Sequence, residues 1–119
     1  MNTKIEYIKK GDYYYPNLVM PPQPEEPLLK YGIMHRDYLK NHRRGIYAAL
    51  RLKGTLKEHC LAVQHRAEER MDQLVTHMAE KEGVTEALKR KDPMSWLRKM
   101  ENIRARAEEI VREGTIYTL

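Results

Sequence analysis

The fold is decided by TLKEHCLAVQHRAEERMDQLVTHMAEKE, residues 55–82, the longest uninterrupted helical pattern in the chain. Apolar residues recur in it at steps of three or four, which places them on one face of a helix. They are Leu56, Cys60, Val63, Ala67, Met71, Leu74 and Met78. Thr55 and Glu58 have the spacing of a capping box, and Gly83 follows the last turn. Such a helix reaches about 42 Å, so its apolar face must pack against other helices, from this chain or a second copy.

A second long helical pattern covers residues 93–113. Asp92 and Pro93 provide an acidic cap and a proline at the first helical position. Its apolar stripe consists of Trp96, Leu97, Met100, Ile103, Ala107, Ile110 and Val111. The two patterns predict two long antiparallel helices, 55–82 and 93–113, joined through a short helix at 85–91 that Thr85 caps.

The rest of the chain predicts smaller elements. Residues 1–20 alternate around a Gly11-Asp12 turn and indicate a β-hairpin, and four prolines make 21–28 an extended connector. Short helices are expected at 31–41 and 43–53. The apolar tail, residues 115–119, either folds back on the helices or adds a strand to the hairpin. We therefore predict a mainly α single domain over residues 1–119: the hairpin (1–20), the connector (21–28) and a helical bundle (30–119).

The positive charge of the chain is concentrated in one segment. The 119 residues carry a net charge of +5, whereas residues 30–57 contain eight basic residues against one acidic residue. Such a segment attracts a polyanion or an acidic protein surface. No apolar run approaches the length of a membrane span, and the N-terminus lacks the pattern of a signal peptide, so we expect a cytoplasmic protein that does not contact membranes. The single cysteine, Cys60, lies on the apolar stripe and is expected to be a buried thiol.

Motifs for catalysis or metal binding do not stand out. His59, His65 and His77 are six and twelve residues apart, which is not the spacing of a helical zinc pair. His35 and His42 lie beside arginines and indicate a surface position or contact with a polyanion. No nucleophile motif, phosphate-binding loop or acid-rich nuclease pattern is evident. We therefore expect that the protein is not an enzyme, that it needs no cofactor or metal, and that it acts by binding a partner.

Nucleic acid is the partner that this charge pattern favours. Phosphate recognition needs lysine and arginine on one surface, and tyrosines that can stack lie between the basic residues of 30–57. The turn through His42-Arg43-Arg44-Gly45 indicates a helix-turn-helix as one mode of docking. A solvated basic face with core tyrosines is the plainer interpretation. The candidate contact residues are Arg36, Lys40, Arg43, Arg44, Arg51 and Lys53.

Four segments of the sequence form a distinctive set: GDYYYPNL (11–18), KYGIMHRDYLKNHR (30–43), GTLKEHC (54–60) and MAEKEGVTEALKRKDPMSWLRKMENIRARAEEIV (78–111). Together they resemble the TnpV proteins encoded by bacterial mobile elements. The resemblance implies a cytoplasmic accessory protein of a transposon and no catalytic residues. It leaves two functions open: binding of nucleic acid or a nucleoprotein complex, or inhibition or modulation of a nucleic-acid-processing protein. Such a protein would be the recombinase of the element or a host defence nuclease such as a CRISPR effector. Either long stripe could also pair in a homodimer.

Overall fold

The computed structural model describes residues 22–119, and in this range the chain is helical without a strand. The elements are α1 (Lys30–His42), α2 (Arg44–Lys53), α3 (Leu56–Lys81), α4 (Glu86–Lys91), α5 (Pro93–Val111) and the π-helical turn η1 (Arg112–Ile116). The prediction of a mainly α chain is therefore confirmed. The hairpin predicted at 1–20 lies outside the described residues.

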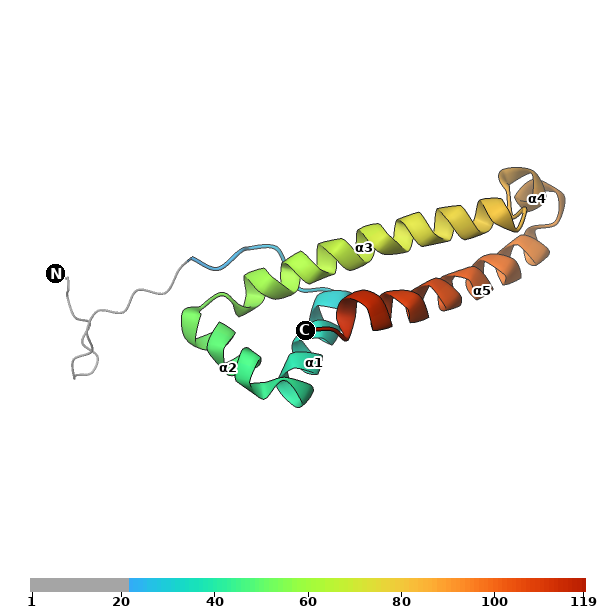
Figure 1. The fold of residues 1–119 in the computed structure, drawn as a ribbon. Coiled ribbons are helices and arrows are strands. Elements are labelled where there is room, and N and C mark those ends of the chain that lie inside the picture. Colours follow the sequence, from blue (N-terminus) through green and yellow to red (C-terminus); the bar gives the residue numbers. More distant parts are fainter. Residues whose placement is uncertain (1–21) are drawn as a thin grey trace, which may run out of the picture.

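The two longest helices, α3 and α5, lie side by side (Figure 1). α5 returns alongside α3 after the short α4. Near α4, Met100 and Ile103 of α5 are buried with Val84 in a cluster that Val75 and Met78 of α3 cover. These contacts bury one apolar stripe against the other, as expected when two amphipathic helices shield each other from water.

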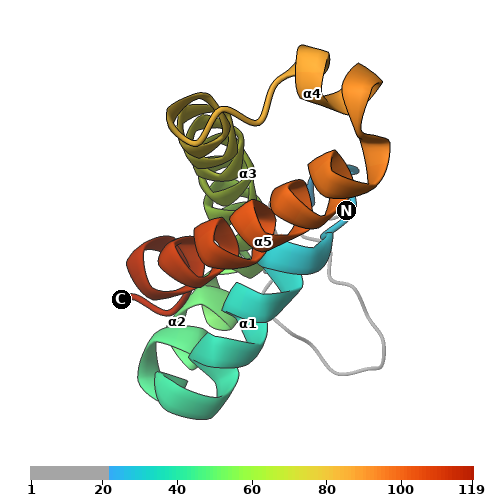
Figure 2. The same ribbon diagram turned by 90° about the vertical axis from the view of Figure 1, so that its right-hand side faces the viewer.

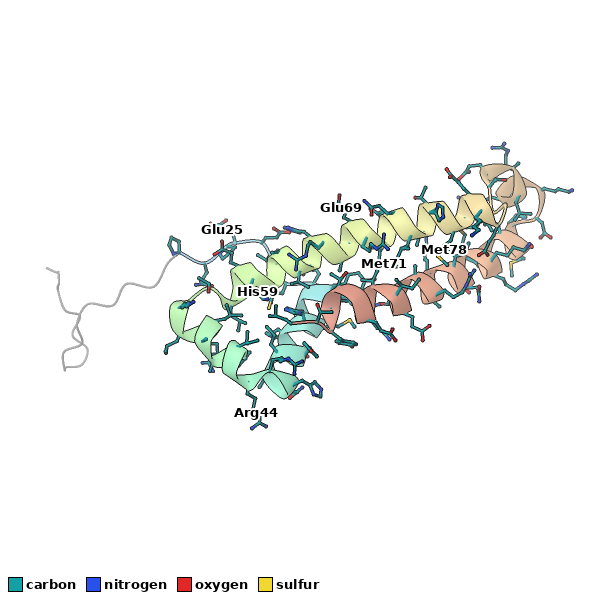
Figure 3. All side chains as sticks on the ribbon, viewed as in Figure 1. Glu25, Arg44, His59, Glu69, Met71 and Met78 are labelled. Carbon is teal, nitrogen blue, oxygen red and sulfur yellow. The ribbon has the colours of Figure 1, made fainter. Side chains whose placement is uncertain are left out.

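A second cluster lies towards the other end of these helices. Ala67 of α3, Val111 of α5 and Ile116 of η1 are fully buried there. Figure 3 shows Met71 and Met78 on the side of α3 that faces α5, whereas Glu69 points to the opposite side. The periodicity of residues 55–82 therefore identified the buried face of α3 correctly.

Two of the predicted helix caps are present in the structure, and one is absent. Thr85 and Asp92 accept hydrogen bonds from Leu88 N and Ser95 N, respectively, so both predicted caps are present. The predicted capping box of Thr55 does not form, because the Thr55 side chain makes no cap hydrogen bond. The backbone at this point ends α2: Gly54 has a φ of 75°, and Thr55 N donates to Leu50 O over 3.0 Å. The Thr55 N–H that a capping box would use thus serves the end of α2.

The extended segment before α1 is held along α3 by polar contacts. Lys57 Nζ donates to Pro24 O over 2.8 Å, and His65 Nε2 lies 2.7 Å from Glu26 Oε2. Deeper in the structure, the buried amide of Gln64 accepts from Leu29 N over 2.5 Å through its Oε1. These bonds fix the position at which α1 begins.

The tail folds back on the helices, which decides between the two alternatives for residues 115–119. Ile116 is fully buried, and η1 contacts α1, α3 and α5. α1 and η1 thus close one end of the long helix pair (Figure 2). α2 contacts α1 and α3, but none of its residues is buried and Leu52 is 86% exposed.

Candidate nucleic-acid interface

The candidate basic residues gather at the α1–α2 end of the molecule, opposite α4 (Figure 1). Only one of them has an acidic partner within residues 22–119: Arg36 Nε lies 3.6 Å from Asp37 Oδ1. The other five are exposed to solvent without a neutralising carboxylate. They are Lys40, Arg43, Arg44, Arg51 and Lys53. Apart from Arg43, which bonds to the tail, they are therefore available to an anionic partner.

Two of these residues share one face of α2. Arg44 and Arg51 are seven residues apart, so they lie about 20° apart around the helix and about 10.5 Å apart along it. Figure 3 shows the Arg44 side chain pointing away from the other helices. Lys53 is nine residues from Arg44 and lies on the opposite side of α2. The predicted set therefore does not form one continuous face, and Arg44 with Arg51 is its most exposed pair.

The remaining basic residues of the set lie on α1 or at its end. Arg36 and Lys40 are four residues apart and share another face of the same end. A helix-turn-helix has a turn of about 3–4 residues between its helices. Here Arg43 alone separates α1 from α2. The predicted helix-turn-helix turn is thus absent at His42–Gly45.

Arg43 holds the tail in place. Its Nε donates to Leu119 O over 2.5 Å, and its guanidinium carbon lies 6.0 Å from the centre of the Tyr38 ring. Nη1 also donates to His42 O over 3.1 Å. Substitution of Arg43 therefore removes contacts within the protein together with any contact to a partner. The Arg44 side chain is exposed and bonds to no other residue in the range 22–119, so Arg44 is the cleaner residue to substitute.

The prediction from the sequence that His35 lies at the surface is wrong. His35 is 1% exposed, with Nδ1 2.7 Å from Ile116 O and Nε2 3.0 Å from Nε2 of His59. Because a carbonyl only accepts, Nδ1 of His35 carries the proton, and its Nε2 accepts from the Nε2–H of His59. Burial lowers the pKa of both histidines, and the charge of Arg66 acts in the same direction. The pair is therefore neutral near pH 7 and links α1, α3 and η1.

A sequence signal for this buried position did exist. Gly32, His35 and Leu39 are spaced by three and four residues, and all three are buried on one side of α1. Cys60 is buried as predicted, and burial raises the pKa of its thiol to about 11. A protonated, inaccessible thiol is a poor nucleophile.

The described part of the chain does not gather ligands for a metal. Among residues 22–119 no group of three or more histidine, cysteine, aspartate or glutamate side chains is placed to hold an ion. The helices between residues 22 and 119 are also too short or too polar to span a bilayer. The arrangement offers an exposed basic end and an aromatic cavity beside it.

The comparison with protein families agrees with the resemblance of the sequence segments. The family described as transposon-encoded protein TnpV matches residues 6–116, which is nearly the whole chain. This chain belongs to the TnpV family. Neither a curated protein nor a solved structure matches it. For this TnpV-family chain, the candidate interface is therefore assigned from its own residues.

Proposed function

We propose that this TnpV-family protein is a non-enzymatic accessory protein of a transposon that binds nucleic acid through its α1–α2 end. The observation that carries the proposal is the pair Arg44 and Arg51. Both side chains are exposed on one face of a helix that has no buried residue, and neither has an acidic partner within residues 22–119. An exposed cationic helix with no carboxylate to neutralise it suits a phosphate backbone.

The spacing of this pair suits adjacent stretches of one backbone. Arg44 and Arg51 are about 10.5 Å apart along α2. At this separation the two guanidinium groups are far enough apart to contact different phosphates of one strand. Lys40 and Arg36 would add contacts at the same end of the molecule. Such contacts position a nucleic acid without selecting its sequence.

The test is binding of labelled duplex DNA, single-stranded DNA and structured RNA over a range of salt concentrations. The variant Arg44→Glu/Arg51→Glu should bind at least tenfold more weakly than the wild type. Its log–log salt slope should also be smaller by about 1.4–1.8, because each phosphate contact contributes about 0.7–0.9. Its melting temperature should change little, since both side chains are exposed.

The matched control is Arg70→Glu/Arg104→Glu, which changes the net charge equally at exposed positions on α3 and α5. This control should retain binding. Equal loss in both variants would mean that net charge matters and that the α2 face is not the interface. Absence of binding by the wild-type protein at low salt would overturn the proposed function.

A protein partner is the second candidate, and the apolar residues of α2 favour it. Leu52 is 86% exposed and Ile46 is 36% exposed on a helix without buried residues. Such residues suit an interface with a nucleic-acid-processing protein, either the recombinase of the element or a defence nuclease such as a CRISPR effector. Binding of a purified recombinase or nuclease that persists at high salt and is lost in Leu52→Asp would favour this function.

A further inference from the structure

A cavity of about 620 Å³ lies between the second half of α1 and the tail. Its size is within the range of about 300–1,000 Å³ that is common for small-ligand sites. Tyr38, His42 and Tyr117 contribute aromatic rings to its lining, and Met34 adds an apolar side chain. The cavity is assembled only when the tail folds back, because Tyr117 is 79 residues away from Tyr38 in the chain.

The aromatic rings of the cavity contact one another as tilted pairs. The centre of the Tyr38 ring lies 5.6 Å from that of Tyr117 and 5.6 Å from that of His42, with interplanar angles of 40° and 36°. Tyr117 is 43% exposed, so part of its ring remains open to solvent. An exposed aromatic ring beside a cavity can stack against another flat ring.

The polar groups of the cavity suit a neutral ligand with a hydrogen-bonding edge. Asp37 contributes acceptors, and Asn41 contributes both a donor and an acceptor. Among residues 22–119, Arg43 is the only arginine or lysine in the lining, and it already donates to Leu119 O and His42 O. The described residues of the lining include one carboxylate and one guanidinium group, so the lining carries no excess of positive charge that would select a free anion such as phosphate.

A nucleobase has the required combination of a flat aromatic ring, no charge and a hydrogen-bonding edge. Arg44, the exposed cation of the proposed interface, directly follows Arg43 of the cavity. A base in the cavity would thus have its backbone phosphates near α2. Bases inside a duplex are stacked and paired, whereas unpaired bases can be splayed out onto aromatic side chains.

We propose that this cavity binds an unpaired base of a single-stranded nucleic acid. The inference rests on the proposed function and deepens it: the basic face of α2 contacts phosphates, and the cavity selects single strands over duplexes. Tyr117 supplies the stacking surface, and Asn41 supplies hydrogen bonds to the edge of the base.

The test compares three labelled probes at one salt concentration: a single strand, its duplex, and the same single strand with abasic sites. The wild-type protein should bind the intact single strand about tenfold or more tightly than the other two. Tyr117→Ala should weaken single-strand binding about 5- to 150-fold, which is the usual range for loss of one stacked base. Its salt slope should not change, because the phosphate contacts remain. Tyr117→Phe keeps the ring and should bind like the wild type.

A second variant guards against a folding defect, since Tyr117 adjoins the buried Ile116. Asn41 is exposed, and Asn41→Leu removes its hydrogen bonds with little change in size. Asn41→Leu should also weaken binding of the intact strand and leave binding of the abasic strand unchanged. A 2-aminopurine base in the strand should change its fluorescence on binding to the wild type, and this change should be absent for Tyr117→Ala.

The outcomes separate this inference from the proposed function. Equal binding of intact and abasic strands would overturn the base-binding cavity. Loss of binding in Arg44→Glu/Arg51→Glu together with full binding in folded Tyr117→Ala and Asn41→Leu would leave the proposed function standing and overturn the cavity. If a mononucleotide bound as tightly as the strand, the proposal that the ligand is a strand would be wrong. If the wild type bound no nucleic acid, the proposed function and this inference would fail together.

Discussion

His35 Nε2 and His59 Nε2 lie 3.0 Å apart at the junction of α1 and α3, and the other ring nitrogen of His35 bonds to the tail at Ile116 O. Only one nitrogen of the facing pair can carry a proton if the bond between them is to form. The contact therefore requires at least one of the two rings to be neutral, and burial favours the neutral state by lowering the pKa of both rings.

This pair predicts a loss of stability in mild acid. A folded-state pKa below 6.5 means that the unfolded chain binds more protons as the pH falls below about 6.5, so acid favours unfolding. Each of the two histidines can contribute at most about 1.4 kcal/mol per pH unit. The free energy of unfolding, measured by urea denaturation from about pH 7 to pH 5, should therefore decrease.

The variant His59→Gln tests the source of this pH dependence. A glutamine amide can still donate to His35 but does not titrate, so the decrease should become shallower. His77→Gln, an exposed position on the same helix, is the control and should behave like the wild type. The exposed His65–Glu26 pair has the opposite sign, because its raised pKa stabilises the fold at low pH and this effect is lost as the pH rises. An unchanged slope in His59→Gln would contradict the assignment.

Substitution of Gly32 should disturb the close packing of α1 on α3. A Cβ at this position would lie 2.5 Å from Gln64 Oε1 and 2.8 Å from Leu28 Cδ2. Gln64 Oε1 is held by its bond from Leu29 N and cannot move away without losing it. Gly32→Ala should therefore lower the free energy of unfolding by about 1–3 kcal/mol. Thermal and urea denaturation would measure this loss.

Gly45 provides the matched control for Gly32. It also lies in a helix, but nothing is within 4 Å of a Cβ built there. Gly45→Ala should leave the protein equally stable or more stable by about 0.5–1 kcal/mol, because alanine has the higher helix propensity. Similar losses at both glycines would argue against close packing of α1 on α3.

Removal of the N-cap side chain should cost more stability at α5, where Asp92 is the cap, than at α3, where Thr55 is. Asp92 Oδ1 accepts from Ser95 N over 3.3 Å, so Asp92→Ala should lower the free energy of unfolding by about 1 kcal/mol. The Thr55 side chain makes no cap hydrogen bond, so Thr55→Ala should cost a few tenths of a kcal/mol or less. Urea denaturation of both variants distinguishes them. A larger loss at Thr55 than at Asp92 would show that the capping box forms in solution.

The local sequence pattern was sufficient to predict the helices and caps that depend only on neighbouring residues. The apolar spacing of residues 55–82 and 93–113 located α3 and α5, and the Thr85 and Asp92 caps form as their sequences indicate. These features arise within one or two helical turns, where the identity of a residue sets its hydrogen bonds and its face. The expected helix bounds differ from the observed ones by one or two residues.

The buried polar side of α1 could not be derived in the same way. His35 and Gln64 are polar residues with almost no exposure, and the groups that satisfy them are 24 to 81 residues away. Periodicity identifies apolar residues that avoid water, but burial of a polar group depends on partners that only the folded chain brings near. The capping box of Thr55 failed for a similar reason, since the end of α2 uses its N–H.

The sequence by itself determined that this chain forms two long amphipathic helices, that Cys60 lies inside, and that the excess of positive charge lies between residues 30 and 57. Only the tertiary structure decided which basic side chains remain available, because Arg43 is bonded to the tail whereas Arg44 and Arg51 are exposed on α2. It also decided that Tyr38 and Tyr117 line one cavity. Charge and periodicity are properties of the chain, whereas a surface or a cavity exists only after distant segments pack together.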